Sequence, residues 1–202
     1  LAGILDYVPA DMVATVQAGV TLDALGRELG KHGQMLALDP YGGVSHTVGG
    51  VLATNASGQR RFRYGTGRAL LLGARFVQAD GTVTWGGSKV VKSVTGYDIP
   101  KLLTGSLGTL GVIVEATLRL HPVQPASGSW LFAFTSREAA GALAAAVLAS
   151  SLEPERLAWL NAGALERVGS EKAEAALAMS VATVAEAVTS QVHSFSCQSA
   201  LT

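Results

Sequence analysis

The sequence predicts an α+β protein of two successive domains, residues 1–123 and 124–202, and three features support this expectation. Segments with alternating β-branched residues, typical of strands, are interspersed with segments that carry helix caps and apolar residues at helical spacing. Of the 24 glycines, fifteen lie between Gly42 and Gly111. Beyond residues 121–125 glycine becomes rare, so we place the domain boundary near residue 123.

The first domain is expected to open with a strand and a helix. Residues 13–19 alternate and end in glycine, which is the pattern of a strand. Thr21 stands as the N-cap of an amphipathic helix that Gly33 closes. Residues 41–67 have little periodicity and much Gly, Ser, Thr and Asn, which predicts a structured loop with one turn of helix near Val51.

A hairpin, a short helix and a long strand are expected to complete this domain. Residues 70–79 form a strand, Asp80-Gly81 is a hairpin turn, and residues 82–85 return. Residues 98–103 predict a short helix with proline just inside its start. The last strand, residues 111–120, alternates regularly. The residues expected on one of its faces are Val112, Val114, Ala116, Leu118 and Leu120.

The second domain is expected to be a small, incomplete α+β unit. Residues 130–134 indicate a strand, and Ser136 caps a helix over residues 137–149. Residues 154–160 resemble the entry to another strand. The Ala-rich residues 171–188 predict a second helix.

Composition excludes several classes of function. Lys plus Arg and Asp plus Glu both number 15, so the chain lacks the basic surplus of a nucleic-acid-binding protein. No stretch approaches the roughly 20 apolar residues of a membrane-spanning helix, and the start shows no signal peptide. The single cysteine, Cys197, rules out an internal disulfide and a Cys-ligated cluster, and favours a reducing, cytoplasmic compartment.

Two glycine-rich segments are the main candidates for a binding site. Residues 47–58 pair glycines with small residues and Asn55, so that the backbone could approach a phosphate-bearing ligand without a Cβ in the way. A turn that packs two elements together explains this segment equally well. In residues 105–113 glycine recurs every third residue before a strand, which fits neither a P-loop nor a Rossmann fingerprint.

Charged groups near these segments give weaker signals. Arg60, Arg61 and Arg63 could pair with a pyrophosphate, form a solvated face or contact a partner. Residues 89–98 carry polar candidates such as Lys92, although Asp98 is better explained as a helix cap. The four histidines lack metal-ligand spacing, and no nucleophile triad or general base is evident. Any redox chemistry would therefore come from a cofactor.

The order of these segments resembles a known family. The matching segments are Val-Gln-Ala-Gly-Val-Thr (16–21), Asp-Pro (39–40), Val-Gly-Gly-Val-Leu-Ala-Thr-Asn-Ala-Ser-Gly (48–58), Arg-Tyr-Gly (63–65), Asp-Gly (80–81) and Gly-Ser-Leu-Gly-Thr-Leu-Gly-Val-Ile (105–113). Together they resemble the FAD-binding domain of the vanillyl-alcohol oxidase/p-cresol methylhydroxylase superfamily. Residues 90–102 are similar to the flavin subunits of bacterial glycolate oxidase, particularly the E-type subunit.

The resemblance implies a fold and a cofactor site. The fold would be α+β, with FAD held non-covalently between two subdomains over residues 1–123 and a partial cap or substrate domain over residues 124–202. The implied cofactor-binding residues are Pro40, Thr47, Val48, Gly49, Gly50, Ala53, Thr54, Asn55, Gly58, Gly65, Gly105, Gly108, Thr109, Gly111, Val112 and Ile113.

The resemblance also implies an activity and partners. In such complexes a 2-hydroxy acid is oxidised to a 2-oxo acid, and electrons continue to an iron–sulfur subunit beside a second flavin subunit. Association with a membrane would be peripheral, through the complex. The family's upstream pyrophosphate loop would lie before Val13 and is expected to be missing here. The cap lacks the family's His-rich metal motif, which favours an accessory flavin subunit over the substrate-oxidising one.

Two alternatives stay open at the level of sequence. A flavin fold that has lost its cofactor could serve as a non-catalytic assembly subunit. A different enzyme on the same fold, such as a reductase of the UDP-N-acetylenolpyruvoylglucosamine type, would need a Ser and a Glu in the cap that cannot be identified.

Overall fold

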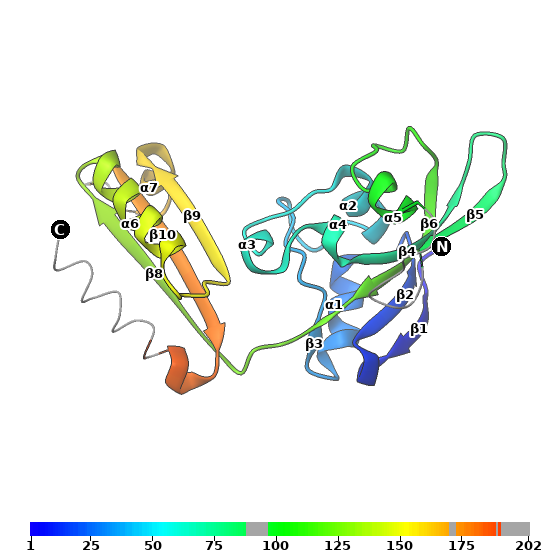
Figure 1. Ribbon diagram of the computed structural model, residues 1–202, viewed down its shortest axis with the longest axis horizontal. Coiled ribbons are helices and arrows are strands. Elements are labelled where there is room, and N and C mark those ends of the chain that lie inside the picture. Colours follow the sequence, from blue (N-terminus) through cyan, green and yellow to red (C-terminus); the bar gives the residue numbers. More distant parts are fainter. Residues whose placement is uncertain (88–96, 170–172, 189, 191–202) are drawn as a thin grey trace. The chain divides into compact units, whose positions relative to one another are not determined.

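The computed structural model describes residues 1–87, 97–169, 173–188 and 190. It divides into two compact units, Leu1–Val123 and Gln124–Thr202, which we call unit 1 and unit 2 (Figure 1). The division falls where the glycine-rich part of the sequence ends.

Unit 1 is organised around a five-stranded antiparallel sheet. Its strands, in spatial order, are β1 (Ile4–Val8), β2 (Val13–Gln17), β6 (Val112–Arg119), β4 (Leu71–Val77) and β5 (Val83–Gly87). The hairpin predicted at Asp80-Gly81 is confirmed, because Gly81 has φ +85° and the Asp80 carboxylate accepts the Thr82 N–H at 2.9 Å. Three strands of unit 1 were not predicted: β1, and the strands β3 (Gln34–Met35) and β7 (His121–Pro122), which form a two-stranded ladder.

Short helices complete unit 1. They are the 3-10 helix η1 (Pro9–Asp11), α1 (Leu22–Gly30), α2 (Val48–Thr54), α3 (Arg61–Tyr64), α4 (Gly67–Leu70) and α5 (Ile99–Leu103). Two predicted caps are confirmed: Thr21 Oγ1 accepts the Ala24 N–H at 3.1 Å, and Asp98 Oδ1 accepts the Lys101 N–H at 3.2 Å. The turn of helix expected near Val51 is confirmed, because α2 lies there, but the rest of residues 41–67 is less irregular than predicted, because α3 also lies there and α4 begins at its end.

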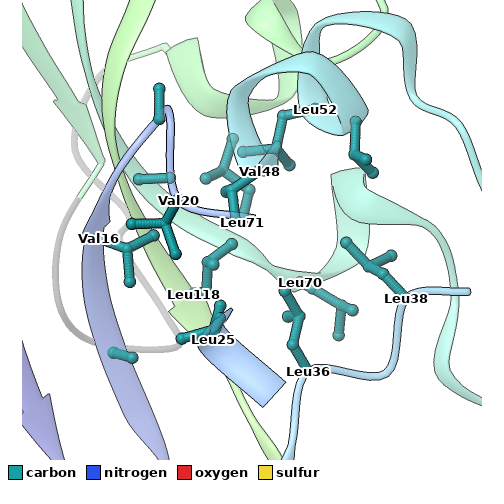
Figure 2. Packing of buried hydrophobic residues seen from close by; sticks show 14 of the residues in the cluster. Val16, Val20, Leu25, Leu36, Leu38, Val48, Leu52, Leu70, Leu71 and Leu118 are labelled. Carbon is teal, nitrogen blue, oxygen red and sulfur yellow. The ribbon is translucent and has the colours of Figure 1, made fainter. Parts of the chain in front are cut away.

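The core of unit 1 lies between the sheet and helices α1 and α2. Figure 2 shows Val16 and Leu118 of the sheet converging with Leu25 of α1, and Val48 and Leu52 of α2 reaching the same cluster. Each of these five side chains is fully buried. Burying an aliphatic side chain of this size contributes about 1.5–3 kcal/mol, so the three apolar residues of α2 anchor an otherwise glycine-rich helix.

Strand β6 departs from the regular alternation that the sequence predicts. The register with β4 shifts between Arg75, opposite Glu115, and Phe76, opposite Ile113, so β6 carries one extra residue there. Such a bulge reverses the faces of the residues before it. Ile113 is therefore buried and Val112 is exposed, whereas the sequence pattern placed Val112 on the buried face.

Unit 2 is a three-stranded antiparallel sheet with two helices. The strands, in spatial order, are β8 (Ala126–Phe134), β10 (Ala175–Thr183) and β9 (Arg156–Asn161), and the helices are α6 (Arg137–Ala149) and α7 (Ala162–Arg167). The predicted cap of α6 is confirmed, because Ser136 Oγ accepts the Ala139 N–H at 3.1 Å. Figure 1 shows α6 lying along one face of the sheet.

The helix predicted over residues 171–188 was wrong, since β10 occupies its centre. Alanine favours helices in isolation, but β10 is the middle strand and pairs with β8 along its whole length. Its small side chains are nearly all buried, which suits a central strand covered on both edges. Tertiary pairing therefore overrides the local preference for helix.

A buried hydroxyl pair in the unit 1 sheet gives a test of this packing. Thr15 Oγ1 of β2 lies 2.9 Å from Thr117 Oγ1 of β6, and both residues are buried. In Thr117→Val the Thr15 hydroxyl loses this partner, so the free energy of unfolding should fall by about 1–3 kcal/mol. The free energy of unfolding of the double variant T15V/T117V should fall by at least about 1 kcal/mol less than the sum of the two single losses, because the double variant leaves no buried hydroxyl without a partner. Urea denaturation measures all three, and simple additivity would contradict the pairing.

Candidate functional site

Helix α2 is the centre of the candidate site, and other segments hold both its ends. At its start, Thr47 Oγ1 accepts the Gly50 N–H at 3.2 Å. The Val48 and Gly49 N–H groups donate to the Val20 and Ala18 carbonyls at 2.8 and 2.7 Å. The N–H groups of Val48, Gly49 and Gly50 are therefore hydrogen-bonded to other groups inside the protein.

The other end of α2 is capped by the second glycine-rich segment. Asn55 takes the left-handed conformation, with φ +50°. Gly105 N–H donates to the Leu52 carbonyl at 2.9 Å, and Leu107 N–H donates to the Ala53 carbonyl at 2.8 Å. The carbonyls at a helix end need such partners. The two segments that sequence analysis singled out separately, 47–58 and 105–113, are thus brought together.

Two polar atoms remain unsatisfied at this junction. Asn55 Oδ1 and Ser106 Oγ are buried, and neither atom has a hydrogen-bond partner among the described residues. Buried polar atoms are normally hydrogen-bonded, and each exception calls for a ligand, water or ion that completes it. Asn55 and Ser106 are therefore the candidate polar contacts of this site. Sequence analysis did not single out Ser106.

Glycines line the surroundings of Asn55. A Cβ added to Gly105 would lie 3.4 Å from Asn55 Cβ, and one added to Gly67 would lie 3.7 Å from Asn55 Oδ1. Gly65, two residues before Gly67, has φ +79°. The backbone of two separate segments, at Gly67 and Gly105, thus comes close to the Asn55 side chain, as a cradle for a ligand requires.

The segment after Ser106 presents an exposed apolar surface. Leu107 has φ +54°, a conformation uncommon for leucine, and 71% of it is exposed. Leu110 and Val112 are exposed as well. Gly108 has φ +76° with open space beside it, and Thr109 Oγ1 donates to the Ser106 carbonyl at 2.7 Å. This loop can lie against an apolar ligand surface without rearranging the core.

Other predicted site residues have a structural reason that does not involve a ligand. A Cβ on Gly58 would lie 1.9 Å from the Asp39 carbonyl oxygen, and one on Gly49 would lie 2.7 Å from Ala18 Cβ. Pro40 is buried next to Asp39. A Cβ on Gly111 would lie 2.7 Å from the Val77 carbonyl oxygen. These residues fix the positions of the segments that carry Asn55 and Ser106.

The remaining candidates lie on different parts of unit 1. Ala53 and Thr54 lie on the last turn of α2, where Thr54 Oγ1 donates to the Gly50 carbonyl at 2.8 Å. Ile113 is buried in the core. Arg60 donates its N–H to the Asp39 carboxylate, at 3.1 and 3.2 Å from the two oxygens. Lys92 lies outside the described residues.

His121, in β7, is half-buried, and sequence analysis did not single it out. Its ring packs against the Tyr64 ring at 4.8 Å between centroids, and its Nε2 is buried without a hydrogen-bond partner. Burial lowers the pKa of His121 below its ordinary value, and the positive charges of Arg119 and Arg63 lower it further. The folded chain therefore favours the neutral imidazole.

The described residues hold no group of three or more His, Cys, Asp or Glu side chains suited to bind a metal. Within the same residues, no helix has the length and apolar character that crossing a membrane requires.

Comparison with known proteins places these features in a family context. Residues 1–87 match a protein family described as "FAD binding domain". The D-2-hydroxyglutarate dehydrogenase of Xanthomonas citri pv. viticola is 37% identical over 174 residues, which cover 86% of this chain and 37% of that enzyme. Glycolate oxidase subunit GlcE of Escherichia coli is 36% identical over 126 residues, covering 62% of this chain and 36% of that subunit. The chain thus spans little more than a third of the length of these relatives.

A solved structure shows the same fold. An alkyldihydroxyacetonephosphate synthase superposes with a TM-score of 0.80 at 22% sequence identity, over 96% of this chain and 39% of that one.

The close approach at Gly58 predicts a large loss of stability. Gly58→Ala should lower the free energy of unfolding by at least about 2 kcal/mol, because a backbone carbonyl cannot move aside as a side chain can. The matched control is Gly26→Ala in α1, where the added Cβ meets nothing within 4 Å. That variant should gain about 0.5–1 kcal/mol from helix propensity. Urea denaturation of both variants is the measurement, and equal stability of the two would contradict the packing described for Gly58.

The half-buried His121, with its lowered pKa, predicts a specific sensitivity to acid. Because its folded pKa is lowered, its contribution to stability is complete above about pH 6.5, the unfolded value, and is lost as the pH falls below it. His121→Phe keeps the ring packing and should lose less stability than the parent between about pH 7.5 and pH 5.5. Thermal melts at both values measure this difference, with the exposed His32→Phe as control. Parallel losses in parent and H121F would show that His121 titrates normally.

Proposed function

Because this chain contains an FAD-binding domain of the vanillyl-alcohol oxidase/p-cresol methylhydroxylase type, we propose that it is the flavin-binding part of an oxidoreductase that converts a 2-hydroxy acid to a 2-oxo acid. FAD supplies the two-electron acceptor for this reaction. The relatives named above include a D-2-hydroxyglutarate dehydrogenase and a glycolate oxidase subunit. Both names refer to 2-hydroxy acids, 2-hydroxyglutarate and glycolate, which supports the substrate class.

One observation carries the proposal: Asn55 Oδ1 and Ser106 Oγ are buried without partners where α2 meets the loop after Gly105. The residues at this junction fit a bound flavin nucleotide. The Asn55 amide and the Ser106 hydroxyl supply polar contacts. Gly67 and Gly105 allow close approach of the backbone to Asn55, and the exposed Leu107 and Leu110 offer an apolar surface that excludes water.

The residues at the junction suit binding of the cofactor and not proton transfer. Asn55 and Ser106 would orient the cofactor through hydrogen bonds. None of the junction residues named above is a carboxylate or histidine that could accept the substrate hydroxyl proton. We therefore propose an accessory, electron-handling role in a glycolate oxidase-type complex, beside a second flavin subunit and an iron–sulfur subunit. Any association with a membrane would then be peripheral, through those partners.

Flavin binding is tested first by the visible absorbance of the purified chain. Flavin bands that pass into the supernatant after heat denaturation would establish a non-covalent site. A chain that stays colourless with added FAD, while still binding an iron–sulfur subunit, would favour the non-catalytic assembly role instead.

The role of Asn55 is tested by substitution that preserves the backbone. Asn55→Gly tolerates φ +50° but removes the amide, so FAD affinity should fall about tenfold, the value of one hydrogen bond of about 1.4 kcal/mol. Titration followed by flavin fluorescence measures the dissociation constant. The control is Asn161→Gly, which removes the cap of α7 in unit 2 and should leave FAD affinity unchanged. An N55G variant that binds as tightly as N161G would refute the assigned role of Asn55.

A further inference from the structure

The sheet of unit 2 has a face that does not contact α6. On β10, Leu177, Met179 and Val181 pack with Leu143 and Val147 of α6. Successive strand residues point to opposite faces, so the intervening residues of β10 lie on the other face. These intervening residues are Ala176, Ala178, Ser180 and Ala182.

Residues of the two neighbouring strands extend this second face. Cross-strand partners in an antiparallel pair share a face. The residues of β8 paired with the second face are Ala133, Leu131, Ser129 and Ser127, and those of β9 are Leu160, Ala158 and Arg156. All four residues of β8 are exposed. Among these described strand residues Arg156 alone carries a charge.

A polar row crosses this face at one level. Ser180 of β10 is opposite Ser129 on one side and opposite Arg156 on the other. Ser180 is only 6% exposed, and its Oγ is buried with no hydrogen-bond partner. A buried hydroxyl without a hydrogen-bond partner is unfavourable. The presence of Ser180 on this face therefore points to a ligand that accepts a hydrogen bond from its hydroxyl.

Arg156 gives the row a positive charge within reach of solvent. About a third of its side chain is exposed, and its Nε lies 3.8 Å from Oε2 of the buried Glu155. That separation is too long for a hydrogen bond, but the attraction restrains the guanidinium. The guanidinium has five N–H donors in a planar fork, so it can bind a second carboxylate besides interacting with Glu155.

We propose that Ser129, Ser180 and Arg156 form a binding site for the carboxylate of a small organic acid. The two hydroxyls donate to the carboxylate oxygens, and Arg156 neutralises the charge. Ala158 and Ala178, two positions along the same face, leave room for a short carbon skeleton. The choice of a 2-hydroxy acid as the ligand rests on the proposed function, whereas the site itself rests only on unit 2.

The experiment is a titration of the isotope-labelled full chain with glycolate, without FAD, followed by NMR. Saturable shifts are expected at the Arg156 side-chain Nε–H and at the backbone amides of Ser129 and Ser180. Glycolamide, which is neutral and of similar shape, should cause no such shifts. Arg156→Lys keeps the charge but loses the planar fork, so affinity should fall about tenfold. Ser180→Ala should weaken binding about threefold through one lost neutral hydrogen bond.

Arg137→Lys is the matched control, because Arg137 lies in unit 2 at the start of α6 and pairs with Glu174 at 3.1 Å. Its affinity for glycolate should equal that of the parent. Equal affinity of R156K and R137K, or an equal response to glycolamide, would overturn the site. An FAD titration of the same samples tests the proposed function separately: FAD binding that is unchanged in R156K, together with weakened glycolate binding, supports both assignments.

Discussion

Backbone hydrogen bonds at the two ends of α2 connect the segments on which the rest of unit 1 depends. Its first N–H groups donate to Ala18 and Val20, and its last carbonyls accept from Gly105 and Leu107. A seven-residue helix is too short to persist by itself. These bonds, with burial of Val48 and Leu52, therefore hold α2 in place, and they also fix the positions of Asn55 and Ser106. The unsatisfied atoms of the candidate site follow directly from this arrangement.

Four glycines of unit 1 illustrate two different physical roles. Gly49 and Gly58 permit close packing against Ala18 and Asp39, and a Cβ at either position would collide with neighbouring atoms. Gly105 and Gly108 have positive φ and lie beside Asn55 or open space. The first group builds the scaffold and the second shapes the surface offered to a ligand. A glycine-rich sequence alone cannot distinguish these roles, because both give glycine at the position concerned.

Features with a local signal could be predicted from the sequence, and features that depend on distant partners could not. The caps Thr21, Asp98 and Ser136 act within three residues, so their side-chain chemistry was sufficient. The strand β10 was mistaken for a helix because its pairing with β8 lies far away in sequence. The bulge in β6 likewise arises from its register with β4. The two candidate segments were found, but their contact through Gly105 and Leu107, and the role of Ser106, required the structure.

Hydrogen–deuterium exchange with and without FAD tests the central claim most directly. If the cofactor is held where α2 meets the loop after Gly105, exchange should slow at the amides of residues 53–56 and 105–111, while amides of the edge strand β1 and of α6 change little. Protection of amides at this junction would locate the cofactor beside Asn55 and Ser106. Saturating FAD that slows exchange elsewhere in the chain, and leaves these two segments unchanged, would contradict the account.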